Sequence, residues 1–206
     1  MAFTRRGFVL TGLAGTAALT LPAAAQNTPM PEELREAIER QAFAPVLGNP
    51  KGNITLTEFF DYNCGFCKAS YPALVAVIRD DPDLRVVYRE WPIFGDDSLA
   101  AARVSLATLK QGKYAPFHAA MMASKQRAAE ATALRAAEAA GLDMAKLKAD
   151  MGSSEVQDHI DHSFALGDHM MLAGTPTWIA GHGGAFGQQT EAELKALIAQ
   201  ARAELL

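Results

Sequence analysis

Three segments with distinct patterns of hydrophobic and polar positions follow one another in the first half of the chain. Residues 54–60 are rich in β-branched and aromatic residues and lie between turn residues, which predicts a buried strand. Residues 67–79 carry apolar residues at helical spacing and include Pro72, which predicts a kinked helix. Residues 84–91 predict a second strand, ended by proline. Strand, helix and strand in this order indicate a right-handed parallel βαβ unit.

The second half of the chain begins with a long helical segment and ends with a short hairpin. Residues 97–173 are rich in alanine and helical in pattern, and strands resume only afterwards, at 177–180 and, past a glycine-rich turn, at 185–187. A last helix follows, ahead of which Thr190 and Glu193 form a capping box. This pattern predicts an α/β fold whose sheet is interrupted by an inserted helical domain.

The start of the chain has the layout of a secretory signal. Residues 1–25 combine Arg5 and Arg6, an apolar run and an Ala-x-Ala cleavage site. The apolar run is shorter than the roughly 20 residues that cross a bilayer, which favours cleavage over a membrane anchor. The paired arginines before Gly-Phe are similar to a twin-arginine signal, with a general secretory signal as the alternative. Both routes predict a protein of the periplasm, where thiols are oxidised.

The remaining chain is long enough for one domain with a sizeable core. Its arm carries a predicted helix at 32–43 and an edge strand at 44–47.

The net charge of −4 and the absence of a basic run in the sequence argue against nucleic-acid binding. The expected organisation is a signal at 1–25, an arm with an edge strand at 26–53, the first part of the α/β domain at 54–96, the helical insertion at 97–173, and the second part at 174–206.

Cys64 and Cys67, the only cysteines, lie where the first predicted strand meets the following helix. Their spacing allows a disulfide, and the N-terminus of a helix stabilises a thiolate on the first of them. A purely structural disulfide is a weaker explanation, because so small a loop adds little stability. The spacing therefore favours thiol–disulfide exchange.

Metal binding through the same two thiols is the alternative from another class of function. It would need further ligands, and nothing in the sequence brings the histidines to the cysteines. We expect His159 and His162 to be solvated helix residues and His118, in an apolar helix, to belong to the core.

Glu58 is an unexpected carboxyl in the first predicted strand. The period of two residues places it on the same face as Leu56 and Phe60, where burial would raise its pKa. Alternatively, it points to solvent near the end of the strand. The sequence favours a functional carboxyl.

The stretch 58–68, the later Gly174-Thr175-Pro176-Thr177-Trp178 and the helical block between them resemble the DsbA-like thioredoxin-fold proteins of bacterial cell envelopes. The resemblance covers residues 44–206. It implies a thioredoxin-like fold with an inserted helical domain and a protein thiol–disulfide oxidoreductase. Its redox centre would be the Cys64–Cys67 disulfide, with no separate cofactor.

The resemblance also implies a role for individual residues. Cys64 corresponds to an exposed nucleophile and Cys67 to a buried resolving thiol. Pro176 corresponds to a cis-proline beside the disulfide, and Glu58 to a buried acid that assists proton transfer at the second cysteine. The implied client-binding positions are Gly65, Phe66, Thr175 and Pro176.

Two departures from the best-known members concern the direction of exchange. Gly65 and Phe66 replace Pro-His, and Thr175 replaces valine, as in the isomerase branch. Those isomerases carry a long oligomerisation module, whereas only a short arm precedes residue 44 here, so we expect a monomer. We expect an oxidase of exported proteins, recycled by a membrane redox partner; a disulfide reductase or isomerase is the alternative.

Overall fold

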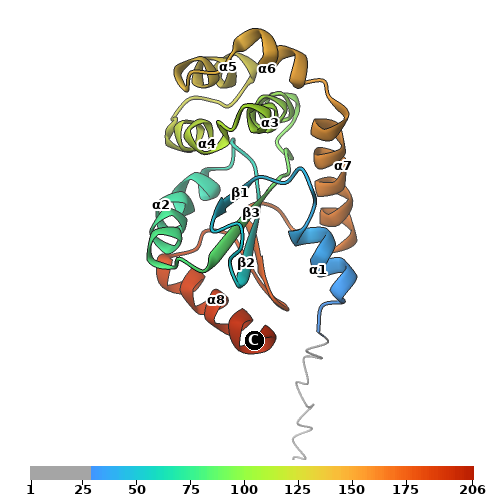
Figure 1. Ribbon diagram of the computed structural model, residues 1–206, viewed down its shortest axis with the longest axis vertical. Coiled ribbons are helices and arrows are strands. Elements are labelled where there is room, and N and C mark those ends of the chain that lie inside the picture. The colour runs from blue at the N-terminus through green and yellow to red at the C-terminus, as the bar shows by residue number, and fades with distance from the viewer. Residues whose placement is uncertain (1–28) are drawn as a thin grey trace, which may run out of the picture.

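A five-stranded mixed sheet forms the centre of the protein in the computed structural model, which describes residues 29–206 (Figure 1). The strand order is β1-β3-β2-β4-β5; β2 runs parallel to β3, and the other neighbours are antiparallel. The predicted signal at 1–25 lies outside the described residues. The strands are β1 (Val46–Gly48), β2 (Ile54–Phe60), β3 (Leu84–Glu90), β4 (Thr177–Ala180) and β5 (Gly183–Phe186).

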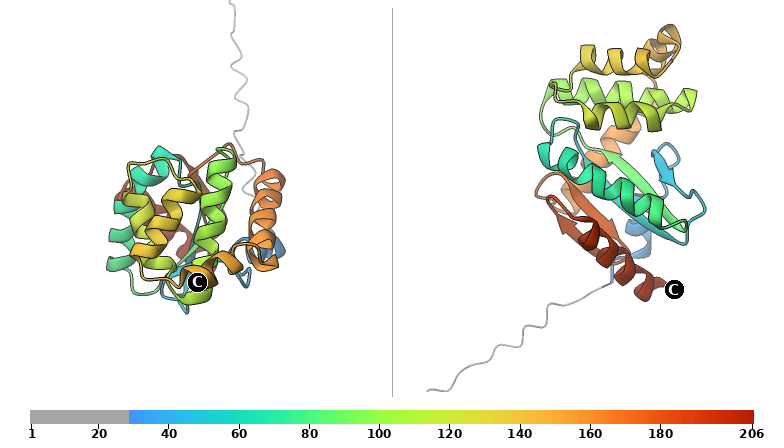
Figure 2. Two further views of the ribbon diagram at one scale, coloured as in Figure 1. Left: turned by 90° about the horizontal axis from the view of Figure 1, so that it is seen from above. Right: turned by 90° about the vertical axis from the view of Figure 1, so that its left-hand side faces the viewer.

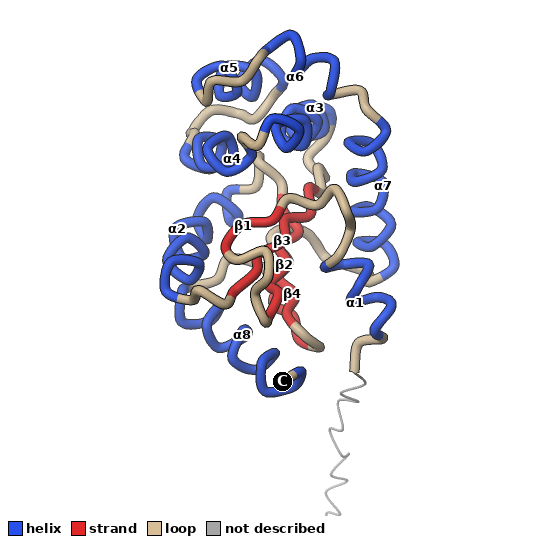
Figure 3. Tube along the Cα trace, in the orientation of Figure 1, coloured by secondary structure: helices blue, strands red, loops and turns tan. Residues whose placement is uncertain are grey.

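Helices cover both faces of this sheet (Figures 1 and 3). One face carries α2 (Gly65–Asp80) and α8 (Glu191–Leu205), and the other carries α1 (Glu32–Glu39) and α7 (Ser154–His169). Every residue of β2 and β3 is consequently buried, as is typical of parallel strands enclosed on both sides. The predicted parallel βαβ unit is confirmed.

The remaining helices gather at one end of the sheet, above the start of α2 (Figures 1 and 2). From this cluster, α7 runs back along the sheet. Within the described part of the chain, no helix combines the length and apolar character needed to cross a bilayer. The cluster comprises α3 (Asp96–Ala107), the 3-10 turn η1 (Thr108–Gln111), α4 (Tyr114–Ala123), α5 (Glu130–Ala139) and α6 (Met144–Asp150).

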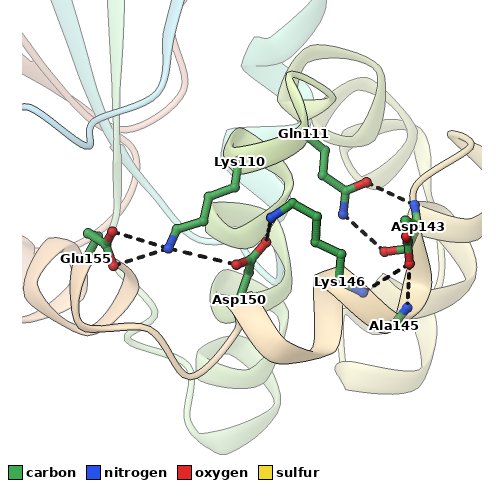
Figure 4. Close-up of polar contacts among 7 residues, drawn as sticks. All are labelled: Lys110, Gln111, Asp143, Ala145, Lys146, Asp150 and Glu155. Atoms are coloured by element: carbon green, nitrogen blue, oxygen red, sulfur yellow. Dashed lines mark hydrogen bonds and ion pairs between the residues drawn. The ribbon is translucent and has the colours of Figure 1, made fainter.

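Polar contacts on the surface fasten η1 to α6 and α7 (Figure 4). The Lys110 ammonium lies 3.2 Å from the Glu155 carboxylate and 3.9 Å from that of Asp150. Gln111 exchanges two hydrogen bonds with the backbone of Asp143, and the Asp143 side chain accepts from the backbone N–H groups at the start of α6. These contacts hold the helical cluster as a scaffold beside the sheet.

Several predicted boundaries are wrong. The helix expected at 32–43 ends at Glu39. Arg40 caps the helix with a non-helical φ of −116°, and the Gln41 side chain beyond it is engaged by Arg89 and His162. The returning strand of the hairpin starts at Gly183 rather than at 185, because Gly181 and His182 alone form the turn.

Other local predictions hold. Gly181 has a φ of 57°, which suits the first central position of a two-residue hairpin turn. The capping box of Thr190 and Glu193 is present at the start of α8. β1 lies at the edge of the sheet, as predicted, although it begins at Val46.

Candidate active site

The two cysteines meet at the start of α2, where that helix points toward the helical cluster. Cys64 is the N-cap of α2, and its Sγ accepts a hydrogen bond from the backbone N–H of Cys67 at 3.3 Å. Both thiols are free, so the structure describes the dithiol form. Cys67 is fully buried, as expected for a resolving thiol.

The expectation of an exposed Cys64 is wrong, since the residue is only 3% exposed. The first turn of α2 and the loop that contains Thr175 enclose its thiol, whereas Gly65 and Phe66 are exposed. Beside this nearly buried thiol, Phe66 is 62% exposed.

The loop before β4 brings Thr175 and Pro176 to this site from 111 residues further along the chain. The Thr175–Pro176 peptide bond is cis, which confirms the prediction. The carbonyl oxygen of Thr175 accepts a hydrogen bond from the Cys64 thiol at 3.2 Å. β4 pairs with β2, the strand that leads into Cys64, and this pairing fixes the loop beside the thiol.

Hydrogen bonding stabilises the thiolate of Cys64. The nearby Cys67 thiol has the largest effect, and the Thr175 side chain and the backbone N–H groups of Cys67 and Phe66 add to it. Together these groups outweigh desolvation and lower the pKa of Cys64 to about 6. The backbone N–H groups at the helix start thus contribute to the lowered pKa of Cys64, although the Cys67 thiol contributes most.

The pKa values of Cys67 and Glu58 are raised, in contrast to that of Cys64. Burial raises the pKa of Cys67, and the Cys64 thiol and the charge of Glu58 raise it further. Glu58 is 1% exposed, because its strand lies between β3 and β4 and is covered on both faces. Burial, followed by the negative charges of Cys64 and Glu90, raises the pKa of Glu58 well above its ordinary value. Glu58 therefore does not point to solvent, and burial favours its protonated form.

Glu58→Gln is expected to slow the proton-dependent step at Cys67 by roughly 100-fold, the usual contribution of a general acid or base. The pH–rate profile of that step should lose the inflection that Glu58 causes. Stopped-flow measurement of exchange from pH 5 to pH 9 tests this, with Glu33→Gln on the exposed side of α1 as the matched control. Identical profiles for wild type and Glu58→Gln would contradict the role.

The same substitution is expected to stabilise the fold at neutral pH. The folded state binds the proton of Glu58 more tightly than the unfolded state does, so this carboxyl lowers the stability of the wild type as pH rises above about 4.5. Glutamine does not ionise, so the variant should not lose stability in this way as the pH rises. Urea unfolding at pH 5 and pH 7 measures the difference, which should be larger at pH 7.

Sequence reasoning missed a second buried carboxyl, Glu90, at the end of β3. Its carboxylate accepts from the Ser105 hydroxyl at 2.5 Å and from the Tyr114 hydroxyl at 3.3 Å. Ser105 in turn bonds Tyr62, which lies two residues before Cys64. Burial raises the pKa of Glu90. The sequence did contain a signal for Glu90, because it is an acidic residue in a strand that is otherwise buried.

Two histidines join this interior network. His118 is buried, as expected, and its Nδ1 lies 2.8 Å from the Tyr62 hydroxyl. Burial lowers the pKa of His118 to about 3, so it is neutral. The expectation of a solvated His159 is wrong: it is buried, and its Nε2 accepts from the backbone N–H of Glu90. α7 packs against β3, and this contact places His159 inside the protein.

Among residues 29–206, no group of three or more His, Cys, Asp or Glu side chains is arranged to hold a metal ion. His162 is exposed on α7 and bonds Gln41, away from Cys64 and Cys67. The described structure thus brings together two thiols, a buried carboxyl and the cis-proline loop, a set suited to thiol–disulfide exchange.

A family model described as the DSBA-like thioredoxin domain matches residues 55–199, most of the chain. The chain belongs to this family. In this DSBA-like protein the matched segment runs from β2 into α8, and it includes both cysteines and the cis-proline loop. The predicted resemblance and the thioredoxin-like fold are confirmed.

Solved structures agree with this assignment. A thioredoxin-like oxidoreductase from Silicibacter pomeroyi DSS-3 is 40% identical, with a TM-score of 0.80 over 82% of this chain and 98% of that chain. The thiol-disulfide exchange protein alpha-DsbA2 from Wolbachia pipientis is 26% identical, with a TM-score of 0.75 over 82% and 91%. A periplasmic thioredoxin-like protein from Salmonella enterica serovar Typhimurium shares the fold at 23% identity, with a TM-score of 0.74 over 84% and 98%.

A curated relative is a much longer protein. The Na(+)/H(+) antiporter NhaA 3 of Salinispora tropica is 26% identical over 135 residues, which are 65% of this chain. The match spans 21% of the antiporter's length. The family and the structural relatives together support a thiol–disulfide oxidoreductase.

Proposed function

We propose that this DSBA-like protein is a periplasmic thiol–disulfide oxidoreductase that oxidises exported proteins. The observation that carries the proposal is the difference between the two thiols: hydrogen bonding lowers the pKa of Cys64 to about 6, whereas burial raises that of Cys67. A stabilised Cys64 thiolate favours the reduced protein, so the oxidised protein readily donates its disulfide.

The proposed reaction begins when a client thiolate attacks Sγ of Cys64 in the Cys64–Cys67 disulfide. A mixed disulfide forms, and Cys67 leaves as a thiolate, which takes a proton from Glu58. A second client thiolate then attacks the client sulfur of the mixed disulfide. Cys64 leaves as a thiolate, the client gains a disulfide, and the two electrons remain on the reduced cysteines. A membrane redox partner would take them up.

Several observations support the location and the clients. The predicted export signal at 1–25 and the periplasmic relative from Salmonella both favour the periplasm. Exposed Phe66 lies beside Cys64, and so does the loop of Thr175 and Pro176, so an extended client segment can lie across these residues. We propose that the protein acts as a monomer.

Redox equilibrium with glutathione tests the direction of exchange. We expect a potential well above the roughly −270 mV of thioredoxin, in the range of about −120 to −200 mV where oxidases and isomerases lie. Mass spectrometry after acid quenching measures the reduced fraction at each glutathione ratio. A potential near −270 mV would contradict the oxidase role and favour a reductase.

A metal carrier that uses the same thiols predicts a different result. Tight stoichiometric binding of Cu(I) or Zn(II) in an anaerobic titration, together with no oxidation of a reduced client, would favour that function. We expect rapid client oxidation instead.

A further inference from the structure

A groove of about 550 Å³ opens beside the active-site cysteines, between the start of α2 and the loop that follows α4. We call it the basic groove. Gly65 lies at its active-site end, and Met122, only 4% exposed, is part of its floor. Three cationic side chains, Lys68, Lys125 and Arg127, also line it.

Hydrogen bonds fix the loop of the basic groove to the active site. The Asn63 side chain donates to the carbonyl of Ala128 and accepts from its N–H, both at 2.8 Å. The Lys68 ammonium donates to the carbonyl of Ser124 at 2.8 Å. Asn63 and Lys68 lie on either side of the two cysteines, so the groove keeps a constant position relative to Cys64.

The charge of the basic groove is opposite to that of the whole chain, which is −4. No carboxylate lines it. Asp97 pairs with Arg127, and buried Asp61 attracts Lys68. Lys125 is exposed and forms no ion pair within the described residues. The groove therefore retains the positive charge of Lys125.

From this charge and position, and on the basis of the proposed function, we infer that the basic groove binds an acidic, extended segment of the client protein next to its reacting cysteine. Gly65 has no side chain, which lets a client backbone pass close to Cys64, and the buried Met122 offers an apolar floor. Opposite charges steer the encounter and fix the orientation of the client segment.

Two peptides that differ only in charge test the inference. Each carries two cysteines, flanked by glutamates in one peptide and by lysines in the other, and their oxidation by the disulfide form is followed at low and high salt. We expect kcat/KM to be roughly 5-fold higher for the acidic peptide, as a few exposed ion pairs would give. At about 1 M salt, where the Debye length is about 3 Å, the preference should disappear.

Lys125→Glu is expected to remove or reverse the preference by changing KM for the two peptides. Lys148→Glu on the exposed surface of α6 introduces the same charge change far from the groove and serves as the matched control. Equal kcat/KM for the two peptides in wild type, or equal effects of the two variants, would overturn the inference.

A third measurement separates this inference from the proposed function. Peptides with serine in place of cysteine are titrated against the protein and binding is followed by NMR, which needs no exchange. Binding of the acidic serine peptide, weakened by Lys125→Glu, would support the groove even if neither cysteine peptide were oxidised. Rapid oxidation of both cysteine peptides with no charge preference would leave the proposed function intact and overturn the groove.

Discussion

Cys64→Ser is expected to lower client oxidation by at least about 1,000-fold, because the covalent route through the mixed disulfide is lost. Cys67→Ser is expected to have a different effect. Its remaining thiol, Cys64, carries the stabilised thiolate and can still form a mixed disulfide with an oxidised client or small disulfide, but no second thiol resolves it. Non-reducing electrophoresis and mass spectrometry of the trapped species measure this difference.

The two serine variants control for each other, since each removes one thiol and changes one atom. Accumulation of a mixed disulfide in Cys67→Ser alone assigns attack to Cys64 and resolution to Cys67. Equal accumulation in both variants would contradict the assignment. Loss of Cu(I) or Zn(II) binding in both, without a mixed disulfide in either, would favour a metal carrier.

The thiolate of Cys64 is expected to titrate near pH 6. Its alkylation rate should rise about tenfold from pH 5 to pH 7 and then stay nearly constant to pH 9. An ordinary thiol with a pKa of about 8.5 would instead rise about 25-fold between pH 7 and pH 9. The ultraviolet absorbance of the thiolate gives the same titration and does not depend on access to the buried sulfur.

The cause of this low pKa can be tested with Cys67→Ala. The Cys67 thiol makes the largest contribution to lowering the pKa of Cys64, so its removal should raise the midpoint. Cys67→Ser keeps a hydrogen-bond donor and should keep most of the effect. An unchanged midpoint in Cys67→Ala would show that Thr175 and the backbone N–H groups stabilise the thiolate without the Cys67 thiol.

Local patterns predicted the central βαβ unit and the two thiols well. Residues 54–60 form β2 as expected, because β-branched and aromatic residues between turn residues favour a buried strand. The helix that starts beside Cys64 and the strand that ends at Glu90 are likewise local features. The helix predicted at 32–43 ends early, at Glu39, and the Gln41 side chain beyond it contacts the distant residues Arg89 and His162.

Long-range packing decided what local patterns could not. His159 has the spacing of a solvated helix residue, yet α7 packs on β3 and encloses it. Glu90 gained its significance only when Ser105 and Tyr114, from two helices of the insertion, closed around it. Cys64 became nearly buried because the Thr175 loop returns to cover it.

The sequence by itself determined the chemistry that is available: two cysteines at a helix start, a carboxyl in the preceding strand and a Thr-Pro pair before a later strand. These features depend on residue type and short spacing, which a chain carries before it folds. Only the tertiary structure decided the values of the pKa shifts, the exposure of Cys64 and the position of the basic groove. Each of these depends on the solvent and the charges around a group, and elements far apart in the chain supply both.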